Sequence, residues 1–222
     1  MKPTIDRIFI SKNADELPAL RGFCEAHKIS LHGKSLLRFE ANAFDIKHPF
    51  DIVFFSSIRA AEFFLATASL QGAKVACIGN TTAEKLISLG IQPTFIGTNS
   101  GDPNQVADAF KDFVGHRRVL IPCSSSSARS MANALQPEQV EEVVVYTTLP
   151  VSVVLPECDV HVFTSPSSVD AFLIENDSPT GLTIAWGTTT AAQMTRCGID
   201  VSVVLKTASE EEVVEVIQAL LK

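Results

Sequence analysis

The sequence predicts an α/β protein made of two similar domains with parallel sheets, and three features of the chain support this prediction. An internal repeat relates residues 55–91 to residues 163–199 at a constant offset of 108. Short, β-branched apolar runs alternate with amphipathic segments, which is the pattern of βαβ units. Runs such as Ile52–Phe55 are continuously apolar, as expected for strands that a parallel sheet buries on both faces.

The repeat is clearest in the turns that follow the apolar runs. Phe55-Ser56-Ser57 returns as Phe163-Thr164-Ser165, and Gly79-Asn80-Thr81-Thr82 returns as Gly187-Thr188-Thr189-Thr190. A period close to half of the chain predicts two like domains and not a solenoid, whose repeats are much shorter.

The strands and helices follow from these patterns and from their end signals. Ser209 precedes three glutamates, which predicts an N-cap with acids in the first helical turn. Gly90 and Gly198 stand where a glycine ends a helix. We expect strands at Arg7–Ser11, Ile52–Ser56, Lys74–Ile78, Thr94–Ile96, Arg118–Pro122, Val143–Tyr146, Asp159–Thr164, Thr183–Trp186 and Val201–Leu205. We expect helices at Asp15–His27, Ile58–Ala68, Thr81–Leu89, Pro103–Phe113, Ala128–Leu135, Val169–Glu175, Thr189–Cys197 and Glu210–Leu221.

The openings of the two halves are also alike, which allows one domain to combine both chain ends. Arg7–Ser11 parallels Arg118–Pro122, and Leu36–Ala43 and Tyr146–Val151 occupy equivalent places as crossovers. We therefore expect a discontinuous first domain at residues 1–37 plus 149–222 and a second domain at residues 41–145. The linkers are expected near residues 38–40 and 146–148.

The composition excludes several classes of protein. A net charge of −7 argues against nucleic acid as a partner. No run of about 18 apolar residues and no export signal is present, so we expect a cytoplasmic protein without a membrane partner. Five scattered cysteines without a C-x-x-C pair, and five isolated histidines, argue against a disulfide framework or a metal site.

Hydroxyl-rich turns at the carboxyl ends of predicted strands are the candidate binding elements. They comprise Ser56-Ser57, Gly79–Thr82, Cys123–Ser127, Thr164–Ser168 and Gly187–Thr190. Ligands bind at this edge of open α/β sheets, where free backbone N–H groups and helix dipoles favour anions. The alternative is that each serine or threonine is simply a good N-cap. We interpret the set, duplicated and all at strand ends, as an anion-binding cleft.

Other motifs narrow the chemistry. The sequence contains no Walker A loop, no G-x-G-x-x-G loop and no G-x-S-x-G elbow. Tyr146, the only tyrosine, lies at the expected crossover, where its phenol could donate a hydrogen bond to a leaving group. The alternative is an amphipathic aromatic at a strand end. Trp186, the only tryptophan, is expected in the core.

The ordered set of motifs resembles the uroporphyrinogen-III synthase family over nearly the whole chain. The motifs are Val53–Ala60, Ile78–Ala83, Val119–Ser124, Val145–Thr148, Phe163–Ser167 and Gly187–Ala191 with Gly198. The resemblance implies two Rossmann-like or flavodoxin-like domains, one inserted in the other and joined by a two-stranded linker. It implies a cofactor-free, monomeric lyase that closes hydroxymethylbilane, a linear tetrapyrrole, into uroporphyrinogen III in heme biosynthesis. Water is lost and the terminal pyrrole ring is inverted.

The resemblance also implies roles for particular residues. Tyr146 matches the tyrosine thought to assist departure of the hydroxyl group. The substrate would be held by Ser56, Ser57, Arg59, Gly79, Thr82, Ser124, Ser125, Thr164, Ser165, Ser167, Gly187, Thr189 and Thr190. The serines after Pro122 depart from the family, which usually places a glycine there. Since a −7 protein does not attract a polycarboxylate over long range, a local positive potential from Lys12, Arg59 or Arg129 is expected.

Two other functions remain open at this point. A two-lobed protein could bind a small anion without performing chemistry. A synthase-like module could instead serve regulation or contact a partner. The tyrosine at the crossover favours the enzyme.

Overall fold

The computed structural model describes residues 4–98, 103–127 and 129–221. The chain forms two compact units, and the second is inserted in the first. Unit 1 comprises Met1–Arg38 and Leu149–Lys222, and unit 2 comprises Phe39–Thr148. None of the helices in the described ranges combines the length and apolarity needed to cross a membrane.

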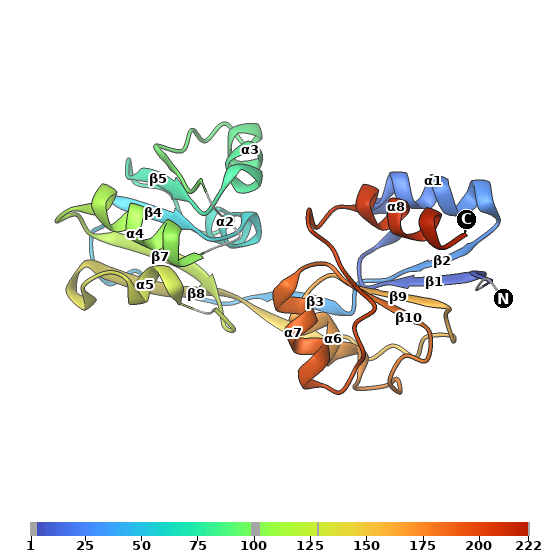
Figure 1. The fold of residues 1–222 in the computed structure, drawn as a ribbon. Helices are drawn as coiled ribbons and strands as arrows, with labels where there is room; N and C mark the ends of the chain where they lie inside the picture. The colour runs from blue at the N-terminus through green and yellow to red at the C-terminus, as the bar shows by residue number, and fades with distance from the viewer. Residues whose placement is uncertain (1–3, 99–102, 128, 222) are drawn as a thin grey trace. The chain divides into compact units, whose positions relative to one another are not determined.

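Unit 1 is a five-stranded parallel sheet in the order β11-β10-β9-β1-β2 with helices on both faces (Figure 1). Helices α1 and α8 pack together on one face, and α6 and α7 on the other. The strands are β1 (Arg7–Ile10), β2 (Ser30–Gly33), β9 (Val160–Phe163), β10 (Leu182–Ala185) and β11 (Val203–Val204). The helices are a 3₁₀ turn η1 (Ala14–Glu16), α1 (Pro18–His27), α6 (Pro166–Phe172), α7 (Thr188–Arg196) and α8 (Glu210–Leu221).

Unit 2 is a six-stranded sheet in the order β3-β8-β7-β4-β5-β6. Its strands are β3 (Leu37–Ala41), β4 (Ile52–Phe55), β5 (Lys74–Cys77), β6 (Phe95–Ile96), β7 (Val119–Ser124) and β8 (Val140–Pro150). Its helices are α2 (Ile58–Leu65), α3 (Asn80–Ser88), α4 (Pro103–Val114), α5 (Ser130–Asn133) and a 3₁₀ turn η2 (Pro137–Gln139). Helices α2 and α3 cover one face, and α4 and α5 cover the other (Figure 1).

Strands β3 and β8 are the two segments that join the units. Bonds from Asn42 N to Val145 O and from Val151 N to Leu36 O show that these strands run antiparallel. The other described pairs of this sheet, β4–β5, β4–β7, β5–β6 and β7–β8, are parallel.

Each sheet separates two apolar clusters, one on each face. In unit 2, Phe55 and Phe64 belong to the cluster under α2 and α3, whereas Phe54 and Phe110 belong to the cluster under α4 and α5. Both faces of β4 are therefore buried, which explains why its sequence is apolar at every position. Unit 1 repeats this arrangement around β9.

The internal repeat corresponds to equivalent elements in the two units. β4-α2-β5-α3-β6 matches β9-α6-β10-α7-β11, and β7 and β8 take the sheet positions that β1 and β2 hold in unit 1. The helix ends match as well. Gly90 and Gly198 have φ of 78° and 76°. The following residues, Ile91 and Ile199, donate to the carbonyls of Leu86 and Met194, as in a Schellman motif.

The predicted α/β class with parallel sheets is confirmed, and several element predictions differ from the structure. Strand β3 was expected only as part of a crossover, β8 is longer than the predicted Val143–Tyr146, and α6 begins at Pro166 instead of Val169. Strand β2 was not among the predicted strands, because Ser-Leu-His-Gly has no apolar run. The helix predicted at Asp15–His27 begins at Pro18, since proline suits the first helical position, and η1 precedes it. The helix predicted at Ala128–Leu135 is α5, which spans four residues, and Ala128 lies outside the described residues.

Candidate functional site

A cavity of about 430 Å³ lies at the carboxyl-end edge of the sheet of unit 2. Residues that end β4 and β7 line it together with Tyr146 from β8 and the turn that leads into α5. This is the edge at which parallel α/β sheets bind ligands. Its lining comprises Ser56, Ser57, Ile78, Ile121, Ser124, Ser127, Arg129, Ser130, Met131, Ala132, Glu142 and Tyr146.

A β-bulge sets the position of Tyr146. Cys123 pairs with Val144, but the next residue, Ser124, pairs with Tyr146, so β8 carries one extra residue, Val145. As a result, Val145 and Tyr146 are both buried although they are consecutive. Bulges of this kind redirect a side chain at the end of a sheet.

Two phenylalanines hold the Tyr146 ring in place. The Phe63 ring stacks on it at 5.1 Å between centroids with an interplanar angle of 19°. The Phe39 ring meets it edge to face at 5.9 Å and 75°. The phenol forms no hydrogen bond with any residue in the described part of the chain. A rigidly held phenol that is free to donate is suited to general acid chemistry.

Arginine side chains lie close to this site in two different environments. The Arg59 guanidinium carbon lies 3.6 Å from the centroid of the Phe39 ring, a cation–π contact. Arg129 donates from Nε to Oε2 of Glu142 at 2.6 Å, and its terminal nitrogen forms an ion pair with the same oxygen. The Arg129 side chain is 64% exposed and that of Glu142 only 13%. Lys12, in unit 1, instead pairs with Glu16 at 4.0 Å.

The serine-rich turn after β7 contributes some of its hydroxyls to the cavity. Ser124 and Ser127 line the cavity, whereas Ser125 is exposed and its N–H donates to the Tyr146 carbonyl at 3.0 Å. Burial, and secondarily the Glu142 carboxylate, raises the pKa of the Cys123 thiol to about 11. Cys123 is therefore protonated at neutral pH and is not a nucleophile.

The strand-end serines Ser57 and Ser165 both serve as N-caps. Ser57 Oγ accepts from Ala60 N, and Ser165 Oγ accepts from Ser168 N, each at 3.2 Å. Ser165 and Ser168 together form a capping box. Capping thus accounts for both hydroxyls, although Ser57 also faces the cavity.

The glycine turns begin α3 and α7 with matching geometry. Gly79 and Gly187 are extended N-cap residues, and their carbonyls accept from Ala83 N and Ala191 N at 3.0 Å. The following threonines differ in exposure, since Thr82 and Thr190 are buried and Thr189 is exposed.

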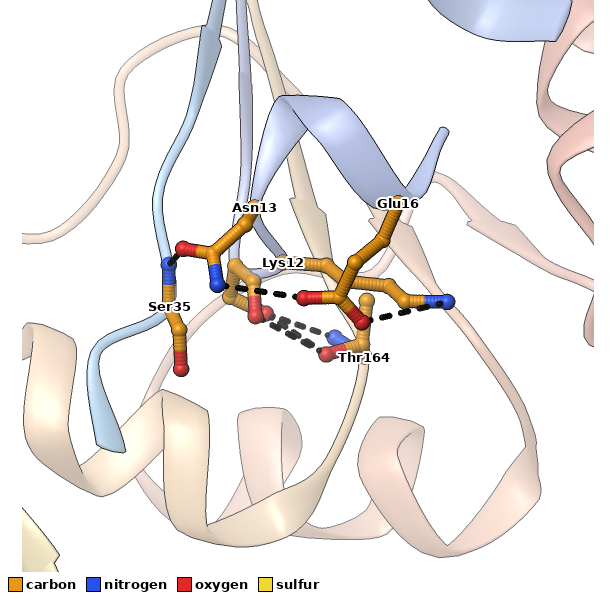
Figure 2. A network of polar contacts seen from close by, with 6 residues as sticks. Lys12, Asn13, Glu16, Ser35 and Thr164 are labelled. Carbon is orange, nitrogen blue, oxygen red and sulfur yellow. Dashed lines mark hydrogen bonds and ion pairs between the residues drawn. The ribbon is translucent and has the colours of Figure 1, made fainter. Parts of the chain in front are cut away.

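At the corresponding edge of unit 1, the hydroxyls bind one another. Ser11 Oγ lies 3.0 Å from Thr164 Oγ1, accepts from Thr164 N at 2.8 Å and donates to Ser168 Oγ at 3.0 Å. Figure 2 shows the neighbouring contacts, in which Asn13 accepts from Ser35 N and donates to Glu16. Ser167 is half-buried beside this network.

The structure thus brings Ser56, Ser57, Ser124 and Tyr146 of the predicted site to one cavity. Ser127 of the candidate turn and Arg129, one of the expected cations, line the same cavity. The predictions missed the acidic cavity residue Glu142 and the two rings that hold Tyr146. Glu142 lies four residues before Tyr146 in the run Glu-Glu-Val-Val-Val-Tyr. The available signal was the pair of charged residues Glu141 and Glu142 directly before the apolar run that ends at Tyr146.

Two flavodoxin-like units, one inserted in the other, define a two-domain α/β protein, and a held tyrosine lies at a strand-end cavity of its second unit. A family model described as uroporphyrinogen-III synthase HemD matches residues 29–217, and the chain belongs to this family.

Solved structures agree with this assignment at the level of the fold. The uroporphyrinogen-III synthetase of Helicobacter pylori 26695 is 18% identical, with 97% of this chain and 100% of that chain covered and a TM-score of 0.73. A mutant uroporphyrinogen III synthase of the extremely thermophilic bacterium Thermus thermophilus is 15% identical, with 97% and 98% covered and a TM-score of 0.62. No curated protein matches the chain.

Proposed function

We propose that this chain cyclises hydroxymethylbilane to uroporphyrinogen III, as a lyase that removes water and inverts the terminal pyrrole ring. Membership of the uroporphyrinogen-III synthase family supports this, and so does the unit 2 cavity in which Tyr146 is held with its phenol unpartnered among the described residues. The cavity is the observation that carries the proposal, because it gives the proposed reaction a location in unit 2.

Tyr146 is proposed to act as the general acid. The C–O bond of the hydroxymethyl group breaks with its electron pair on oxygen, which takes the phenol proton and leaves as water. The substituted α-carbon of the terminal pyrrole ring attacks the carbon that remains, which gives a spirocyclic intermediate. The bond from this α-carbon to its original methylene bridge then breaks and the bridge carbon re-forms a bond at the free α-carbon, so the ring is inverted. The proton that this second carbon loses as the ring regains its aromaticity restores the phenol. General acid assistance of this kind contributes about 10²- to 10⁴-fold to a rate.

The remaining predicted residues are proposed to hold the substrate in the conformation that favours ring inversion. Because the pyrrole nitrogens can expel the hydroxyl group unaided, selectivity depends on positioning. In unit 2 the positioning groups are the cavity serines, Arg59 and the Gly79 turn with Thr82. In unit 1 we propose Thr164, Ser165, Ser167 and the turn of Gly187, Thr189 and Thr190.

We further propose that the protein acts in the cytoplasm as a monomer and without a cofactor. The five cysteines are free thiols, as expected for a protein of a reducing compartment. Size-exclusion chromatography with light scattering tests the oligomeric state, since a dimer mass would contradict it.

A product assay tests the proposed function. Freshly generated hydroxymethylbilane is supplied, the products are oxidised, and type I and type III porphyrins are separated by chromatography. We expect an excess of type III over a protein-free control. Type I alone, formed at the uncatalysed rate, would contradict the proposal and favour a binding or regulatory module.

A further inference from the structure

The unit 2 cavity contains an acid where a polycarboxylate substrate would be expected to meet cations. Glu142 lines the cavity with Tyr146, and its side chain is 13% exposed. A carboxylate in this position repels the carboxylates of the substrate, and the protein already carries a net charge of −7. The acid is therefore unfavourable for binding unless it contacts another part of the substrate.

The geometry of the Arg129–Glu142 pair leaves one carboxylate oxygen available. Both contacts of Arg129 go to Oε2 of Glu142. Oε1 makes no hydrogen bond with any residue in the ranges that the structure describes. A carboxylate can accept at both oxygens, so Glu142 retains an acceptor while Arg129 fixes its orientation.

Arg129 also retains donors of its own. A guanidinium has five N–H groups, and this side chain is 64% exposed. The pair therefore presents a cation to the substrate's carboxylates on one side and an anionic acceptor on the other. A pyrrole ring has the complementary arrangement, because its N–H group and its acidic substituents lie on different edges.

The charge of the reacting ring changes during the proposed reaction. When the hydroxyl group leaves with its electron pair, positive charge develops on the pyrrole ring that carried it and is shared with the ring nitrogen. A fixed anion near this N–H group binds the cationic ring more strongly than the neutral one, which is the condition for lowering a barrier.

We propose that Glu142 is a further catalytic residue, whose Oε1 accepts the pyrrole N–H of the ring that loses its hydroxyl group and stabilises the positive charge that develops there. This role rests on the proposed function. It assigns Tyr146 to the leaving oxygen, Glu142 to the ring nitrogen, and Arg129 to a carboxylate of the same ring.

The test compares Glu142→Gln with Glu138→Gln in the full-length protein. Glu138 is exposed on η2 in the same unit, so both variants lose one negative charge but only one of them changes the cavity. We expect Glu142→Gln to lower kcat about 100-fold, the scale of losing one preorganised electrostatic group. KM should stay the same or fall, because Arg129 is released for the substrate, and the type III share of the product should decrease.

For Arg129→Gln we expect the opposite kinetic pattern, with the larger change in KM. This substitution removes the cation that meets the substrate's carboxylates, so KM should rise several-fold with a smaller change in kcat. Thermal unfolding of each variant shows whether it is folded. If Glu142→Gln does not fold, Glu142→Asp keeps the charge and withdraws it by one methylene, and its kcat should still fall.

Each outcome separates the two proposals. A wild-type protein that forms only type I product overturns the proposed function and this role with it. A wild-type protein that forms type III product, combined with a Glu142→Gln variant whose kcat equals that of Glu138→Gln, overturns only the role of Glu142. A Glu142→Gln variant whose KM rises while its kcat is unchanged would likewise overturn the role of Glu142 and leave the proposed function standing.

Discussion

The two units contain the same hydroxyl-rich turns at equivalent strand ends but use them differently. In unit 2, Ser56 and Ser124 line a cavity with Tyr146. In unit 1, Thr164, the counterpart of Ser56 in the repeat, is bound by Ser11. Composition therefore identifies the edge of the sheet but not whether its hydroxyls are available to a ligand.

The neighbouring strand accounts for part of this difference. In unit 2 the strand beside β7 is β8, which spans eleven residues and carries the bulge that buries Tyr146. In unit 1 the equivalent strand, β2, spans four residues and ends at Gly33. The two units share a scaffold, and the longer, irregular strand of unit 2 supplies Tyr146, the proposed general acid.

Replacing Tyr146 by phenylalanine tests whether unit 2 carries the chemistry, and we expect the largest effect here. The ring would keep its contacts with Phe39 and Phe63, so folding should be preserved. Loss of the phenol proton should lower kcat for type III product by about 10²- to 10⁴-fold. Steady-state kinetics together with a thermal melt check this, and wild-type turnover in a folded variant would remove the proposed role.

One matched core position, His161 in β9 and Val53 in β4, carries a titratable side chain in unit 1 only. His161 Nδ1 is enclosed without a hydrogen bond in the described part of the protein. Burial lowers the pKa of His161 from its ordinary value of 6.5 to about 4, although Asp159 acts in the opposite direction. Val53 is fully buried in an apolar cluster.

This difference predicts that acid destabilises unit 1. Below about pH 6.5 the unfolded state takes up a proton that the folded state does not, so stability falls as the pH drops towards 4. The loss is up to about 3 kcal/mol, which His161→Val should abolish. Urea unfolding at pH 7.5 and pH 5 measures it. The reciprocal variant Val53→His should introduce the same sensitivity into unit 2, and equal pH dependence of wild type and His161→Val would contradict the prediction.

The sequence predicted the parts of the fold that local patterns specify. Apolar runs and the repeat located β4 and β9, the strands that end just before Ser56 and Thr164. Both strands are buried on both faces, so β4 is apolar at every position and β9 at every position except His161. Strand β2 was not predicted, because it lies at the edge of its sheet and is partly exposed, so its residues need not form an apolar run.

The site was less predictable because its contacts join distant parts of the chain. Ser11 and Thr164 are 153 residues apart, and nothing local to either shows that they bind each other. The bulge that buries Tyr146 depends on the register between β7 and β8. The pairing of Arg129 with Glu142 depends on the same two strands, so sequence could suggest the cation but not its partner.

The matched pair Ser56 and Thr164 tests the difference in hydroxyl use directly. Thr164→Val removes one hydrogen-bond partner of the buried Ser11 hydroxyl and should lower the free energy of unfolding by about 1–2 kcal/mol. Ser56→Ala should leave stability within about 0.5 kcal/mol, because Ser56 is exposed, and should raise KM. Denaturant titration and kinetics of both variants check this, and equal stability losses would show that the two edges are used alike.

The two N-caps give the smallest expected effect and the closest comparison between the units. Ser57 and Ser165 have nearly identical backbone angles, φ −159° in both and ψ 155° and 158°, and each accepts from the third residue of its helix. Replacing either by alanine should cost about 1 kcal/mol of stability. The loss should be similar in the two variants, because Ser165→Ala removes only the side-chain acceptor and leaves the bond from its backbone N–H to Ser168 Oγ in place. Both serines are proposed to hold the substrate, but only Ser57 also lines the unit 2 cavity, so Ser57→Ala should raise KM more than Ser165→Ala. An equal rise in the two variants would mean that the unit 1 edge contributes as much to substrate binding as the unit 2 cavity, and that the two edges do not differ in how they use their hydroxyls.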